Sequence, residues 1–122
     1  LALTELSLEL PVTITEDIAA TSGNDLFVAG AVGAAISDFG LLGSDALYIG
    51  TGFTFNASSV AGADSESALL EMWLTQVGED TLVSLETSPL GANAAEVEGF
   101  SITLTGIPLA SIVLEQGFIS VL

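Results

Sequence analysis

The sequence predicts a single all-β domain, built as a β-sandwich or a short β-roll with an extended strand at its N-terminus. Half of its 122 residues are apolar, which is enough to form the core of one domain. Apolar and polar residues mostly alternate, and this is the period of half-buried strands. The 13 glycines, together with Asn and Asp, divide the chain into short segments of the kind that turns separate.

The first predicted strand covers residues 1–15, "LALTELSLELPVTIT". Its apolar positions of one parity are Leu6, Leu8, Leu10, Val12 and Ile14. Pro11 has no N–H donor, which favours an edge position. Two interpretations remain open. The segment is either the first strand of the domain's own sheet or an extended arm that completes the sheet of a neighbouring subunit, followed by a β domain over residues 16–122.

The later elements are also mostly strands. Residues 26–28 and 46–49 are short strand candidates bounded by Gly, Asn and Asp. Residues 68–77, "ALLEMWLTQV", fit both helical and strand spacing, but Gly78 and the following "TLVSLET" favour a β-hairpin. "FSITLTG" alternates cleanly, and "IPLASIVLEQGFISVL" predicts a turn at Pro108 and an apolar end. The aromatic residues expected in the core are Phe53, Phe55, Trp73 and Phe100.

The charge of the chain excludes several functions. There is no Lys, Arg or His against 16 Asp and Glu, so the net charge is −16. Phosphate backbones would be repelled, and anionic membrane surfaces are disfavoured. No apolar run approaches the ~20 residues of a membrane span. Imidazole, thiol and amine groups are missing, which removes the usual catalytic bases, nucleophiles and ligands of zinc, copper and haem. We therefore expect a non-enzymatic protein, with a carboxylate-only hydrolase as a distant alternative.

Oxygen ligands remain, and they suit Ca²⁺. Gly23, Asn24 and Asp25, followed by Leu26 and Phe27, fit the half-pattern G-x-D-x-U of a calcium β-roll, in which the last residue points into the roll. The other interpretation is a tight turn before a strand. We expect one such half repeat and no second copy, and hence one or two Ca²⁺ ions.

Three stretches resemble the C-terminal region of bacterial repeats-in-toxin (RTX) proteins that use type I secretion. The first, "SGNDLFVAGA…AISDFGLLGSDALYIG", is similar to the segment where such proteins leave their nonapeptide repeats. The positions that carry this likeness are Ile36, Asp38, Phe39, Gly43, Asp45 and Leu47. The others are "QVGEDTLVSLETSPLG" and the C-terminal "FSITLTGIPLASIVLEQGFISVL". The resemblance covers roughly residues 20–122 and implies an RTX-like β domain with a terminal type I export segment, an extracellular or cell-surface location, and Asp38 or Asp45 as further calcium ligands.

These observations lead to two expectations of function. The first is a secreted, non-enzymatic structural protein that self-assembles into an extracellular filament or matrix by β-strand complementation, assisted by Ca²⁺. Its partners are copies of itself and, during export, the type I secretion machinery. The second is a calcium-dependent adhesion or binding module, or the C-terminal export module of a larger type I secreted protein.

Overall fold

The computed structural model describes residues 11–30, 32–58, 60, 64, 68–88 and 99–122. Most of the predicted N-terminal strand, residues 1–10, lies outside this part of the chain. The described residues form strands and one short 3-10 turn, η1, at Leu109–Ser111, so the prediction of a single all-β domain is confirmed. Among these residues there is no helix of the length and apolarity that a membrane crossing requires.

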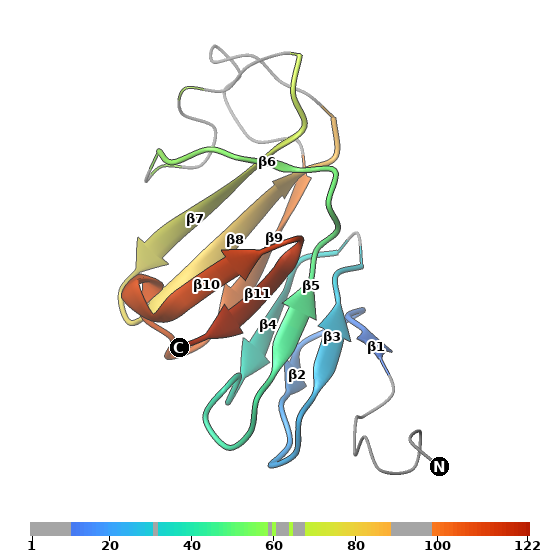
Figure 1. The fold of residues 1–122 in the computed structure, drawn as a ribbon, viewed down its shortest axis with the longest axis vertical. Coiled ribbons are helices and arrows are strands. Elements are labelled where there is room, and N and C mark those ends of the chain that lie inside the picture. The colour runs from blue at the N-terminus through green and yellow to red at the C-terminus, as the bar shows by residue number, and fades with distance from the viewer. Residues whose placement is uncertain (1–10, 31, 59, 61–63, 65–67, 89–98) are drawn as a thin grey trace.

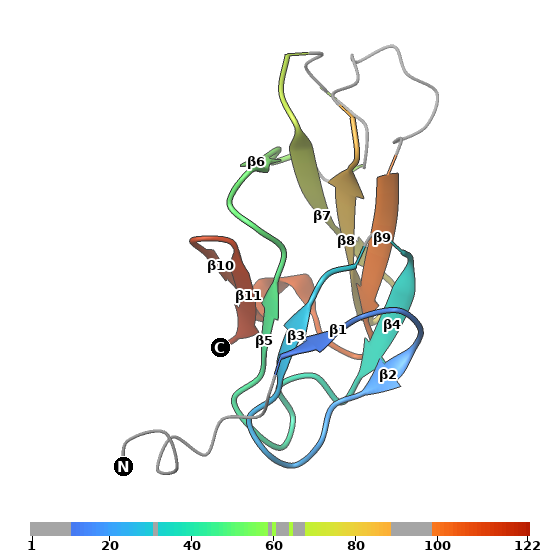
Figure 2. The same cartoon turned by 90° about the vertical axis from the view of Figure 1, so that its right-hand side faces the viewer.

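Two mixed sheets face each other (Figures 1 and 2). The first half of the chain contributes the short strands β1 Val12–Thr13, β2 Ile18–Ala19, β3 Leu26–Val28, β4 Ala34–Ser37, β5 Ala46–Tyr48 and β6 Thr54–Phe55. The second half contributes β7 Glu71–Val77, β8 Asp80–Glu86, β9 Gly99–Leu104, β10 Ile112–Glu115 and β11 Phe118–Val121. One sheet has the strand order β1-β3-β5-β11-β10, and the other has the order β2-β4-β9-β8-β7-β6. We call them sheet A and sheet B.

The first half of the chain is a short parallel roll. Strands β1, β3 and β5 pair in parallel in sheet A, while β2 and β4 pair in parallel in sheet B. The chain therefore crosses from one sheet to the other at each step from β1 to β6, as Figure 2 shows. The second half extends both sheets with antiparallel pairs, β7–β8–β9 in sheet B and β10–β11 in sheet A. Both predicted architectures, a roll and a sandwich, are thus represented.

Alternating apolar residues of the two sheets form the core. Phe27 and Leu47 lie at paired positions of β3 and β5, with exposed fractions of 2% and 0%. Ile36 of β4 and Ile102 of β9 come from the facing sheet and are completely buried. The ring of Phe39 closes the turn after β4, with its centroid 6.2 Å from that of Phe27. Phe27 thus points into the roll, as the half-repeat pattern predicted.

The segment with ambiguous spacing is a strand. Residues Glu71–Val77 form β7 and turn at Gly78 into β8, with Met72 opposite Leu85. Trp73 is fully buried. Phe55, in contrast, is 47% exposed, so the expectation that it lies in the core is wrong. Its strand, β6, has only two residues and lies at the edge of sheet B, where little covers its side chains.

The described end of the N-terminal segment belongs to the domain's own sheet. Val12 and Thr13 form β1, which pairs with β3. The N–H of Ile14 donates to the carbonyl of Val28 at 2.8 Å, and the Ile14 side chain is only 1% exposed. The first interpretation of this segment therefore holds for residues 12–14. A strand donated to a neighbour would have to come from residues 1–10.

Candidate functional site

The turns before β3 and β5 stack on each other and carry the predicted calcium residues. The register of the two strands places Leu26 opposite Ala46. "GNDLF", residues 23–27, is therefore aligned with "GSDAL", residues 43–47. The second stretch is also a G-x-D-x-U half repeat, so the expectation of a single copy is wrong. The two aspartates are 20 residues apart, which is not a multiple of the nonapeptide length.

Glycine is required where the two turns meet. A Cβ atom at Gly43 would collide with the carbonyl oxygen of Gly23 in the turn before β3. The backbone N–H of Ser44 donates to Asn24 Oδ1 at 2.9 Å, and the N–H of Ala46 donates to the carbonyl of Asp25 at 3.0 Å. The turns are thus held to each other by main-chain and amide groups.

The two aspartates that follow these glycines accept hydrogen bonds from backbone N–H groups. Asp25 Oδ2 accepts from the N–H of Thr21 at 2.7 Å, and Asp25 Oδ1 accepts from the Thr21 hydroxyl at 2.9 Å. Asp45 Oδ1 accepts from the N–H of Asp25 at 2.9 Å, and Asp45 Oδ2 accepts from the N–H of Gly40 at 2.7 Å. The Asp25 carboxylate thus bonds within the turn before β3. The Asp45 carboxylate bonds within the turn before β5, through Gly40, and to the turn before β3, through Asp25. Asp45 is 4% exposed and Asp25 is 9% exposed.

The carboxylates of Asp25 and Asp45 accept hydrogen bonds from N–H and hydroxyl donors in the structure. Calcium takes six to eight oxygen ligands, whereas both oxygens of Asp45 face the positive ends of N–H dipoles. Asp38, the remaining predicted acidic ligand, is exposed and has a left-handed backbone with φ of 60°. Among the described residues, no group of three or more His, Cys, Asp or Glu is arranged to hold a metal. Calcium at these turns stays a prediction.

A pair of buried glutamates was missed in the sequence. Glu71 and Glu86 lie opposite each other on β7 and β8, with exposed fractions of 3% and 1%. Glu86 Oε1 accepts from the N–H of Glu71 at 2.7 Å, and Glu71 Oε2 accepts from Asn56 Nδ2 at 3.0 Å. Only the antiparallel register of β7 and β8 brings them together, and no spacing in the sequence reveals it. These two hydrogen bonds connect the segment that contains Asn56 to the edge of sheet B.

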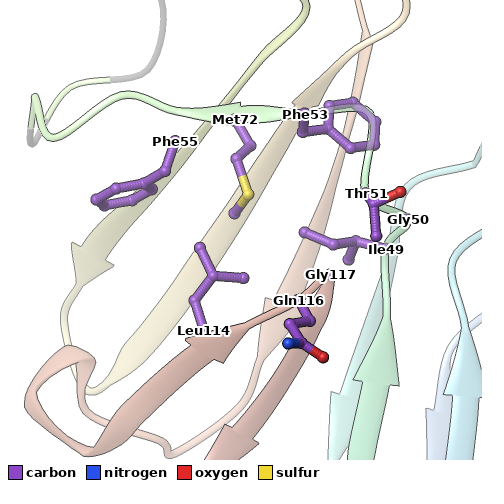
Figure 3. Close-up of a pocket in the computed structure, with 9 residues that line it drawn as sticks. All are labelled: Ile49, Gly50, Thr51, Phe53, Phe55, Met72, Leu114, Gln116 and Gly117. Atoms are coloured by element: carbon purple, nitrogen blue, oxygen red, sulfur yellow. The ribbon is translucent and has the colours of Figure 1, made fainter.

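The second feature of interest is an apolar pocket of about 240 Å³ where the two sheets separate (Figure 3). Its large side chains are Ile49, Phe53, Phe55, Met72 and Leu114. The remaining lining residues are Gly, Thr and Gln, so none is charged. Phe53, Phe55 and Met72 lie on one side in Figure 3, with Leu114 and Gln116 across from them. We call this feature the seam pocket.

The comparisons with known proteins do not assign the chain to a family. Neither the protein-family models nor the curated proteins give a match. The resemblance to RTX proteins therefore stays an expectation.

Proposed function

We propose that this protein is a non-enzymatic structural subunit that associates with copies of itself by strand complementation, outside the cell. One observation carries the proposal. Within the predicted strand over residues 1–15, the apolar residues of one parity begin at Leu6, but the described domain takes up only the end of this series, as β1 Val12–Thr13 and the buried Ile14. The preceding leucines at positions 6, 8 and 10 have the pattern of a strand with one apolar face, which a second copy can bury.

The surface of the described domain supports this proposal. Nine large apolar side chains are at least 41% exposed, on a chain whose net charge is −16. Single exposed apolar residues are ordinary, but they add to the area that association can bury. The charge opposes the approach of a second copy, so association should need dissolved salt to screen it. No specific metal site is needed for such screening.

The test compares the full chain with the variant Leu6→Ser/Leu8→Ser/Leu10→Ser. We expect the full chain to form oligomers at high ionic strength and the variant to stay at the 12.3 kDa of a single chain. Light scattering coupled to size-exclusion chromatography measures both masses. A variant that associates as strongly as the full chain would rule out donation by residues 1–10.

A second function, the terminal module of a larger protein, has one observation in its favour. β1 and β2 are the edge strands of sheets A and B at the same end of the roll. A preceding coil could therefore pair with both edges in parallel, as β3 and β4 do one coil later. A full chain that stays monomeric at every ionic strength would favour this module over a self-associating subunit.

A further inference from the structure

The seam pocket lies where both sheets end. Sheet A ends at β10, and sheet B ends at β6, which pairs with β7 only through Thr54 and Phe55. On its outer side, β10 has no neighbouring strand among the described residues. An edge strand of this kind presents backbone N–H and C=O groups that can pair with an added strand.

The core is incomplete at this seam. Phe53, Ile112 and Leu114 pack against the buried core but remain only partly buried themselves. Phe55 beside them is 47% exposed. The pocket volume of about 240 Å³ exceeds the ~150 Å³ of an engineered apolar cavity that takes up benzene. It can therefore receive one or two aliphatic side chains from another segment.

Residues 1–10 have the alternating apolar sequence that can fill the seam pocket. Leu6, Leu8 and Leu10 fall on one face of an extended strand, and Glu5 and Glu9 fall on the other. A strand paired with β10 would place alternate leucines over the pocket and both glutamates toward water. A cationic partner would find no charged side chain in the lining, so the pocket selects for an apolar segment.

Leu8 and Leu10 of the same chain cannot reach the outer edge of β10. β1 and β10 are at opposite edges of sheet A, four strand spacings or roughly 19 Å apart. The pocket also lies beyond the C-terminal end of β5, whereas the chain enters β1 at the other end of these parallel strands. Leu8 is four residues before Val12 and stays within about 14 Å of it. A strand whose Leu6, Leu8 and Leu10 all lie along the outer edge of β10 must therefore come from a second copy.

We propose that the seam pocket, with the outer edge of β10, is the acceptor for residues 1–10 of a second copy of this chain. This inference rests on the proposed function and names its acceptor site. Donor and acceptor are different surfaces at opposite edges of sheet A, so the contact is head-to-tail and each copy keeps one free donor and one free acceptor. Repetition of the contact gives an open filament where the rotation between copies does not close a ring.

A complementation experiment tests this inference. The donor variant is Leu6→Ser/Leu8→Ser/Leu10→Ser, which keeps the pocket intact. The acceptor variant is Phe55→Glu, which places a charge in the pocket at a side chain that is already 47% exposed and keeps the arm intact. Phe118→Glu is the matched control, because Phe118 is 41% exposed and lies outside the pocket lining. Circular dichroism and Trp73 fluorescence verify that each variant folds.

We expect each variant alone to be a monomer of 12.3 kDa in sedimentation velocity, and their equimolar mixture to form a dimer of twice that mass. The Phe118→Glu chain should associate like the unmodified chain. The acceptor site lies elsewhere if the Phe55→Glu chain associates normally. The same holds if the mixture stays monomeric while the unmodified chain associates. Either result overturns the acceptor site but leaves strand donation itself open. If the unmodified chain is itself monomeric at high salt, both the proposed function and the acceptor site are wrong.

Discussion

Replacing Asp45 by Asn should destabilise the domain strongly and independently of calcium. Asp45 is 4% exposed, and its two oxygens accept from the N–H groups of Asp25 and Gly40 at 2.9 and 2.7 Å. The side-chain amide of the substituted residue keeps one acceptor oxygen for one of these two N–H groups. Its NH₂ group then faces the other N–H group, which is also a donor. One buried N–H then loses its partner, and the surviving bond loses its charge. A buried donor without a partner costs about 1–3 kcal/mol, so we expect a total loss of about 2–3 kcal/mol.

That loss is a large part of the stability of a small domain, which is about 5–15 kcal/mol. It should lower Tm by roughly 10 °C. Urea unfolding monitored by the fluorescence of Trp73, the single tryptophan, measures the change, because this side chain is fully buried in the folded state. Each titration is run with calcium and again with a chelator.

Asp38→Asn is the matched control, because it makes the same chemical change at an exposed side chain. Asn also tolerates the left-handed backbone at this position, where φ is 60°. We expect its effect to stay within about 0.5 kcal/mol. Equal effects of the two substitutions would refute the role of the Asp45 hydrogen bonds. A loss at Asp45 that occurs only in the presence of calcium would instead restore the metal site that the sequence predicted.

Three further predictions concern the turns, the core and the charge. Gly43→Ala should cost about 1–3 kcal/mol in urea unfolding, because its Cβ meets the Gly23 carbonyl, whereas Gly52→Ala, with open space at its Cβ, should be nearly neutral. Thr81→Val should cost about 1–2 kcal/mol, because the buried Thr81 hydroxyl donates to the Ile107 carbonyl at 2.7 Å. Self-association of the full chain should strengthen with NaCl, since the screening length falls from about 10 Å at 0.1 M to 3 Å at 1 M.

Each of these predictions has a contradicting outcome. Equal stabilities of the two glycine variants would mean that the stacked turns are not in close contact. A fully stable Thr81→Val chain would mean that water or another group satisfies the carbonyl. For the charge, Ca²⁺, Mg²⁺ and Na⁺ should act alike at matched ionic strength. A response to Ca²⁺ alone would point to a specific site instead of screening.

The all-β class could be predicted from the sequence because most of the strands alternate apolar and polar residues. "TLVSLET" and "FSITLTG" became β8 and β9, and the hairpin inferred for residues 68–77 exists. Phe27 points into the roll, as its place after a glycine–aspartate turn predicted. Patterns of period two report which face is buried and need no knowledge of the partner strand.

The features that sequence reasoning missed depend on register between distant segments. Gly43, Asp45 and Leu47 can be read in the sequence, but only the alignment of β3 with β5 shows that "GSDAL" stacks on "GNDLF" as a second half repeat. Glu71 and Glu86 meet only across the β7–β8 hairpin. Phe55 alternates like a core residue, but its strand lies at the edge of sheet B. The aspartates were correctly placed in turns, and their carboxylates accept backbone N–H groups that the pattern could not identify.

The most direct test of strand donation is a cross-link between two chains. The protein has no cysteine, so Leu8→Cys in one chain and Phe55→Cys in another introduce the only two thiols in an equimolar mixture. Mild oxidation followed by a non-reducing gel should give a disulfide-linked heterodimer, and replacing Phe55→Cys by Phe118→Cys should greatly reduce it. A strong heterodimer band with Phe118→Cys and none with Phe55→Cys would contradict the seam pocket as the place where the second copy's strand is bound.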